Sequence, residues 1–157
     1  MHGLVTEAVS DAVADGVEAP SKDNGISAGV IGVLVRTFGP ETAHEDLTAI
    51  RRRQDRFVSV DLAGDEHGWS ADLFGEHFDL ARHAGLRVTA HAGEGAGPES
   101  VRTALDQLRP ERIGHGVRAA EDPYLRERLA REGVALELAL TSKVHGVWGR
   151  GPGERAR

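Results

Sequence analysis

The chain of 157 residues contains no cysteine. This absence excludes disulfide bridges, a thiolate nucleophile and a thiolate metal site, so any metal must be held by histidine and carboxylate side chains. A chain without cysteine is typical of a reducing, intracellular compartment. We therefore expect a cytoplasmic protein.

Basic charge and aromatic side chains are also scarce. The chain has 19 lysine and arginine residues against 25 aspartate and glutamate residues, a formal net charge of −6, and 4% aromatic residues. A protein that binds phosphate backbones needs a basic surface, and one that stacks bases needs aromatic platforms. The composition therefore argues against nucleic-acid binding.

Long apolar runs are missing as well. The longest, residues 28–35, is interrupted by Gly29 and Gly32 and is far shorter than the roughly 20 residues of a membrane span. Residues 1–7 lack the basic start of a signal peptide. With 39% hydrophobic residues the chain can form one domain with an aliphatic core, and no membrane association is expected.

Short β-branched or aliphatic segments alternate with amphipathic segments along the chain. This alternation indicates repeated strand–helix units and a parallel sheet. The predicted strands are Val30–Arg36, Phe57–Asp61, Arg87–His91, Arg112–His115 and Val134–Leu138. The predicted fold class is α/β.

Helix signals lie between these strands. Pro40 suits the first turn of a helix over residues 41–53, with His44, Leu47 and Ile50 on one face. Ser70 is suited to cap a second helix, which carries Leu73, Phe74, His77, Phe78, Ala81 and Ala84 and ends at Gly85.

Two later helices and one N-terminal helix complete the pattern. Pro98 opens a helix that stops before Pro110, and Asp122 caps one that ends at Gly133. Residues 4–14 predict a helix, while residues 16–25 combine turn-forming residues and are interpreted as a connector.

The functional groups of a parallel α/β fold lie on the loops that follow the carboxyl ends of the strands. Three successive strand ends carry polar motifs: residues 61–66 read DLAGDE, residues 91–94 read HAGE and residues 114–116 read GHG. These loops offer a carboxylate, an imidazole with a carboxylate, and an imidazole. Asp65 and Glu66 are interpreted as members of a solvated loop.

Isolated histidines usually lie on the surface or in a satisfied core. This interpretation is the simpler one for His2, His44, His67, His77, His83 and His145. His91 and His115 differ because both end apolar strands beside small residues that leave room for a ligand. A neutral imidazole can bind a metal, and Glu94 can transfer a proton, so the group suits metal-assisted hydrolysis.

Residues 61–66, 91–94 and 111–116 (ERIGHG) resemble, in order and spacing, the adenosine deaminase family. The likeness extends from about Leu4 to about His145. It implies a TIM-type (β/α) barrel, one zinc ion and hydrolytic removal of the 6-amino group of adenosine or a related 6-aminopurine as ammonia. By this resemblance the substrate is an aminopurine nucleoside or base, and the family also includes adenine and aminofutalosine deaminases.

The resemblance also implies roles for individual residues. His91 would be a zinc ligand, Glu94 the proton donor to the purine ring and His115 the group that orients the attacking hydroxide. Gly64 would offer a backbone donor to the purine, and Asp61 would support the site without touching the metal or the substrate.

Several family features are missing from this sequence. The family's His-x-His pair and its later Asp-Asp pair do not occur, so the chain offers one of four protein zinc ligands. The family's Cys-Pro-Thr-Ser-Asn run is replaced by a segment in which Lys143 takes the final position. After His145 the likeness stops.

We therefore expect a chain shortened at both ends. Residues 1–145 would form a partial barrel of about five of eight parallel strands, and the Gly- and Arg-rich residues 146–157 a disordered tail outside the family. Deamination would be impaired by loss of the first and last strands. The alternative is a non-catalytic remnant or subunit whose open barrel edges bind a partner chain or a second copy.

Overall fold

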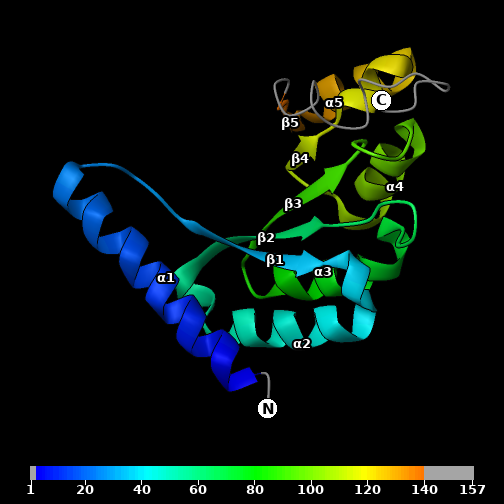
Figure 1. The fold of residues 1–157 in the computed structure, drawn as a ribbon. Coiled ribbons are helices and arrows are strands. Elements are labelled where there is room, and N and C mark those ends of the chain that lie inside the picture. Colours follow the sequence, from blue (N-terminus) through cyan, green and yellow to red (C-terminus); the bar gives the residue numbers. More distant parts are fainter. Residues whose placement is uncertain (1–2, 140–157) are drawn as a thin grey trace, which may run out of the picture.

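The structure, a computed structural model, describes residues 3–139. It is built from five strands and five α-helices joined by short 3₁₀ turns (Figure 1). The strands are β1 (Val30–Val35), β2 (Phe57–Ala63), β3 (Arg87–Ala92), β4 (Arg112–His115) and β5 (Ala135–Glu137). The helices are α1 (Gly3–Asn24), α2 (Gly39–Arg52), α3 (Gly75–His83), α4 (Pro98–Leu108) and α5 (Pro123–Glu132).

The five strands form one parallel sheet in the order β1-β2-β3-β4-β5. Each strand therefore pairs with its predecessor in the chain, and a helix connects each pair. The predictions of an α/β fold, five parallel strands and their positions are confirmed, with boundaries that differ by one or two residues. No helix in the described range has the length and apolar character needed to cross a bilayer.

The two faces of the sheet differ in character. Alternate residues point to the helices and form a dry aliphatic core, which includes Leu34, Val60, Leu62, Val88, Ala90 and Ile113. Helices α2, α3 and α4 cover this face (Figure 1). The other face is polar and partly open, and the register places Asp61, Thr89 and His91 on it.

Helix α2 begins one residue before Pro40, which occupies the first turn as predicted. Its buried stripe is Ala43, Leu47 and Ile50, whereas His44 is exposed and does not belong to it. The ends of α4 and α5 agree with the predicted proline and glycine positions. The carboxylate of Asp122 accepts hydrogen bonds from the N–H groups of Tyr124 (2.9 Å) and Leu125 (3.2 Å).

The prediction of a helix capped by Ser70 is wrong in its first turn. Residues 71–74 form a 3₁₀ turn, α3 starts only at Gly75, and the Ser70 side chain makes no capping hydrogen bond. The tighter winding turns Leu73 towards solvent while Phe74 stays buried. The predicted end is confirmed, because Gly85 takes a left-handed φ of +81°.

The predicted connector over residues 16–25 is helical, which corrects the sequence interpretation. Helix α1 continues past Pro20 to Asn24. The helix ends in a Schellman arrangement, in which Gly25 N–H donates to Lys22 O (3.3 Å) and Ile26 N–H donates to Ser21 O (2.9 Å). Turn-forming residues here mark the end of the helix rather than its absence.

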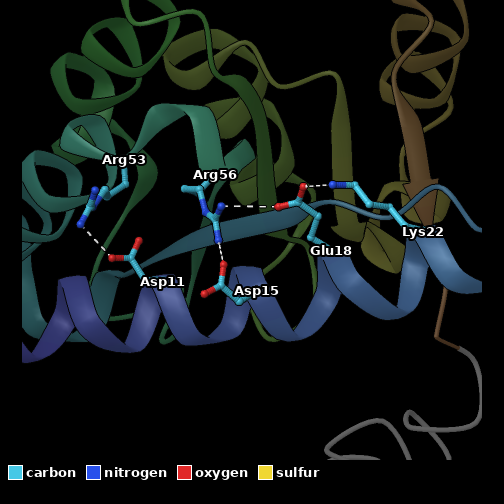
Figure 2. Close-up of polar contacts among 6 residues, drawn as sticks. All are labelled: Asp11, Asp15, Glu18, Lys22, Arg53 and Arg56. Atoms are coloured by element: carbon cyan, nitrogen blue, oxygen red, sulfur yellow. Dashed lines mark hydrogen bonds and ion pairs between the residues drawn. The ribbon is translucent and has the colours of Figure 1, made fainter.

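Ion pairs hold α1 against the segment that follows α2 (Figure 2). Arg53 pairs with Asp11 (2.8 Å), and Arg56 pairs with Asp15 and Glu18. These tertiary contacts add to the local preferences of the helix and favour its extension. The predicted tail of residues 146–157, and also Lys143, lie outside the described residues.

Candidate active site at the carboxyl ends of β2, β3 and β4

The partly exposed His91 pairs with the buried Asp61 on the open face of the sheet. Asp61 lies on β2 and is almost fully buried, and its Oδ2 is 2.7 Å from Nδ1 of His91. Its Oδ1 accepts a hydrogen bond from the Thr89 hydroxyl (2.8 Å). Interaction with Asp61 raises the pKa of His91 above its usual value, although burial acts in the opposite direction. The carboxylate thus fixes the orientation of the ring.

Glu94 and His115 meet beside this pair. Oε2 of Glu94 lies 3.2 Å from Nε2 of His115, and the rings of His91 and His115 approach edge to face with centroids 5.2 Å apart. The structure therefore brings Asp61, His91, Glu94 and His115 into one chain of contacts. These groups come from the ends of three neighbouring strands.

Glycine residues of β4 and the turn after it allow His115 to come close to His91. A Cβ at Gly114 would lie 2.9 Å from the His91 ring, so β4 can approach that ring only with glycine at this position. His115 itself has a φ of +65°, which costs an L-amino acid about 1–2 kcal/mol. Gly116 N–H donates to Ala92 O (2.9 Å) and holds the turn in place.

Gly64 lies at the end of β2 with a φ of +116°. Its nearest side-chain neighbours are Thr37 and Arg36 at the end of β1, and a Cβ would come within 2.7 Å of the Thr37 hydroxyl. Gly64 therefore lies at the same edge of the sheet as the other four predicted site residues. Gly64 thus packs against the 3₁₀ turn that follows β1.

Glu66 is a site residue that sequence reasoning missed. Its carboxylate accepts hydrogen bonds from the N–H groups of Gly93 (2.8 Å), Glu94 (2.9 Å) and Gly95 (3.2 Å) and from the Ser100 hydroxyl (2.5 Å). Burial opposes ionisation, but these four donors together lower the pKa of Glu66. The sequence predicts that Asp65 and Glu66 lie in a solvated loop. Asp65 is exposed as predicted, but the prediction is wrong for Glu66.

A second missed residue is Arg36, which has no exposed surface. Its guanidinium donates to His91 O (2.7 Å) and to Trp69 O (3.1 Å), and burial lowers its pKa. The sequence carries no signal that connects Glu66 with the N–H groups of residues 93–95, because every loop has backbone donors. Arg36 gives no signal either, because the apolar strand before it does not distinguish a buried arginine from an exposed one.

The remaining described histidines follow the simpler interpretation. His77 is buried, and its Nε2 lies 2.9 Å from Pro40 O. His67 is largely exposed, and Nδ1 of His83 lies 2.7 Å from Asp79 O. His2 and His145 lie outside the described residues.

The fit of a metal ion to the site is partial. An imidazole whose Nδ1 faces a carboxylate, as in His91, has the orientation found in metal-ligating histidines. Nε2 of His115 instead faces Glu94. Between residues 3 and 139 no group of three or more His, Cys, Asp or Glu side chains could hold an ion. This part of the chain therefore does not form a complete metal site.

Comparisons with known proteins relate the chain to deaminases. Residues 1–149 match the family model for adenosine deaminase. The chain is 47% identical over 143 residues to an adenosine deaminase of Serratia proteamaculans, a match that covers 91% of this chain and 43% of that protein. The chain thus spans less than half the length of this curated relative.

Two solved structures extend the likeness to the fold. An adenine deaminase from Arthrobacter aurescens superposes with a TM-score of 0.83 at 32% identity, over 88% of this chain and 42% of that one. An amidohydrolase from Burkholderia ambifaria with bound Zn superposes with a TM-score of 0.76 at 31% identity, over 82% and 36%. The five strands correspond to part of a TIM barrel. The chain belongs to the adenosine deaminase family.

Proposed function

We propose that this chain carries the proton-transfer part of a hydrolytic deaminase that acts on adenosine or a related 6-aminopurine and releases ammonia. The observation that carries the proposal is the contact between Glu94 and His115 (3.2 Å) beside the His91–Asp61 pair. Adenine and aminofutalosine remain alternative substrates of the same chemistry.

In this proposal each side chain has a defined task. Water adds its oxygen to the purine carbon that bears the amino group, while Glu94 delivers a proton to the adjacent ring nitrogen. Of the two protons that the water loses, one passes to the amino group, which leaves as ammonia when the carbon–nitrogen bond breaks, and the other restores the protonated Glu94 as the carbonyl group of the product forms. His115 orients the attacking oxygen, and Gly64 offers its backbone N–H to the purine. Asp61 keeps the His91 ring in one orientation.

We propose one zinc ion as the metal, with His91 as the ligand that residues 3–139 contribute. Zinc in hydrolytic enzymes lowers the pKa of a bound water. The support is the carboxylate at Nδ1 of His91 together with the relative that contains Zn. Within residues 3–139 no group of three potential ligands gathers around His91, so a complete site needs further ligands.

The test is an assay of adenosine deamination by the purified chain with added zinc. The loss of adenine absorbance measures the rate. Glu94→Gln keeps the size of the side chain and removes the transferable proton, so we expect it to reduce the rate about 100-fold or more. Glu99→Gln changes an exposed glutamate of α4 and is the matched control. Equal rates for Glu94→Gln and the unmodified chain would contradict the role of Glu94.

A second candidate function is that of a non-catalytic remnant or subunit that binds a partner chain or a second copy. It is favoured by the free edges of β1 and β5 in the described sheet and by Ile31 and Val33, which expose 44% and 45% of their surface on the open face. A folded chain without deaminase activity would support this alternative.

A further inference from the structure

We infer that Glu66 is a positioning residue, which holds the loop between β3 and α4 in the conformation where Glu94 reaches His115. The inference deepens the proposed function, because it assigns to Glu66 the task of placing the proposed proton donor. It rests on the geometry of one carboxylate and the segment that it binds.

Both oxygens of Glu66 are used. Oε2 accepts from Gly93 N–H (2.8 Å) and from the Ser100 hydroxyl (2.5 Å), and Oε1 accepts from the N–H groups of Glu94 (2.9 Å) and Gly95 (3.2 Å). Three consecutive backbone donors therefore converge on one side chain from a different strand end. A carboxylate meets this demand better than a neutral group because charged hydrogen bonds are about twice as strong.

The shape of this loop depends on a glycine and on an acceptor from another segment. Gly93 has a left-handed φ of +67°, and a Cβ there would lie 2.5 Å from a methyl group of Val101. Gly93 is buried, so its N–H group needs an acceptor within the protein, because a buried donor without a partner costs free energy. Glu66 supplies that acceptor. The N–H groups of Glu94 and Gly95 are directed to the same carboxylate.

A second anchor lies at the start of the same loop. Arg36 donates to the carbonyl oxygen of His91 (2.7 Å), two residues before the first N–H that binds Glu66. The segment that carries both His91 and Glu94 is thus held by a cation at its beginning and by an anion along its middle. Of these two anchors, Glu66 binds the backbone of Glu94 itself.

Glu66 acts through Glu94 in this scheme and does not touch the reacting atoms. Loss of its carboxylate would free the loop and increase the average separation of Glu94 and His115. The consequence is specific, because the His115 ring should then lose the influence of the Glu94 carboxylate while the rest of the fold is kept.

The experiment is nuclear magnetic resonance on the purified full chain at a fixed pH near neutrality. The ring resonance of His115 reports the presence of the Glu94 carboxylate, and its change in Glu94→Gln defines the full effect. In Glu66→Gln we expect the His115 resonance to move in the same direction. In the variant that carries both Glu66→Gln and Glu94→Gln, we expect the second substitution to change the His115 resonance by less than half as much as it does in the unmodified chain.

Amide exchange provides an independent measurement. In Glu66→Gln the amides of Gly93, Glu94 and Gly95 should exchange at least about 10-fold faster, while those of the β2 and β3 core are unchanged. Glu99→Gln alters neither the exchange rates nor the His115 resonance. If Glu66→Gln does not fold, Ser100→Ala removes one of the four donors and should shift both readouts in the same direction by less.

The inference is overturned if the His115 resonance and the three exchange rates in the folded variant match those of the unmodified chain. It is also overturned if Glu94→Gln has its full effect in the Glu66→Gln background. These readouts need no turnover, so a chain without deaminase activity would refute the proposed function and leave the test of Glu66 intact. With turnover, Glu66→Gln should lower kcat and leave KM within about twofold.

Discussion

The Arg36 side chain is fully buried, so backbone carbonyl groups must replace water as partners of its guanidinium. Two of its donors reach carbonyl oxygens on different segments, Trp69 in the loop after β2 and His91 on β3. The two terminal nitrogens of the planar guanidinium each reach one carbonyl, whereas lysine carries all its donors on one nitrogen and does not match both positions.

Arg36→Lys should therefore lower the free energy of unfolding by about 2–4 kcal/mol, because a buried charge loses partners that it cannot replace. Urea unfolding followed by circular dichroism measures this loss. Arg51→Lys, at an exposed position of α2, is the control and should change stability by less than about 0.5 kcal/mol. A similar small change for Arg36→Lys would contradict the anchoring role.

Glu66 should make stability depend on pH in the acid range. Its pKa in the folded chain is lowered by its hydrogen bonds, so its contribution is complete above the unfolded pKa of about 4.3 and is lost as pH falls through the folded value. The difference in urea midpoint between the unmodified chain and Glu66→Gln should accordingly be constant from pH 6 to 7 and shrink below about pH 4.3. A difference that grows on acidification would show the opposite sign and refute this assignment.

The residues that meet at the site differ in how well sequence reasoning could find them. His91 and His115 stand out because each ends an apolar strand beside glycine. Glu66 follows one such strand but looks like an ordinary polar loop residue, and only the folded loop of residues 93–95 reveals three N–H groups aimed at it. Partners from separate loops are set by tertiary geometry, which single-sequence patterns do not contain.

At the scale of elements, α1 is attached mainly through exposed charges. Asp11, Asp15 and Glu18 pair with Arg53 and Arg56 (Figure 2). Ala14 is the single described residue of α1 that is fully buried. An element held in this way is expected to respond to ionic strength more than the core helices do.

Raising the salt concentration, or replacing Arg56 by Gln, should loosen α1 without unfolding the sheet. Arg56→Gln removes both of the pairs that this residue makes with α1. Amide exchange should become faster within residues 11–22 and stay unchanged in β2 and β3, with Arg51→Gln as the control. Equal protection of α1 in both variants, at low and high salt, would mean that apolar contacts hold the helix.

Helix ends show which local rules are dependable. Glycine in a left-handed conformation ends both α3 and α5, at Gly85 and Gly133, as the sequence indicates. Glycine is less dependable within a helix, because α1 continues through Gly16 and ends only at Asn24, before the left-handed Gly25. Single turn-forming residues weaken a helix by small amounts, and ion pairs with the neighbouring segment can offset that loss.

At the scale of the whole molecule, the sheet formed within residues 3–139 has helices on one face, and among these residues its other face is open and both its edges are unpaired. The apolar side chains of Ile31 and Val33 lie at one end of this open face, on the edge strand β1. Unpaired edges beside exposed apolar residues favour association between chains.

Ile31→Lys should reduce self-association, because a charge on an edge strand opposes strand pairing. Sedimentation over a range of protein concentrations should show assemblies for the unmodified chain and a shift towards single chains for the variant. Tyr124→Lys changes an apolar side chain that is 82% exposed on α5 and serves as the control. Association unaffected by Ile31→Lys would mean that this edge is not the contact surface.

The sequential order of the strands also bears on how the chain acquires its structure. Each strand pairs with the one that precedes it, and the Thr89–Asp61 hydrogen bond joins residues only 28 apart. Short loops are closed quickly and at low entropic cost. As each strand leaves the ribosome, its partner has already emerged. Among the contacts described for the site, the hydrogen bond from Arg36 to His91 O joins the residues that lie farthest apart in the sequence, 55 positions. Arg36 is therefore synthesised long before its partner.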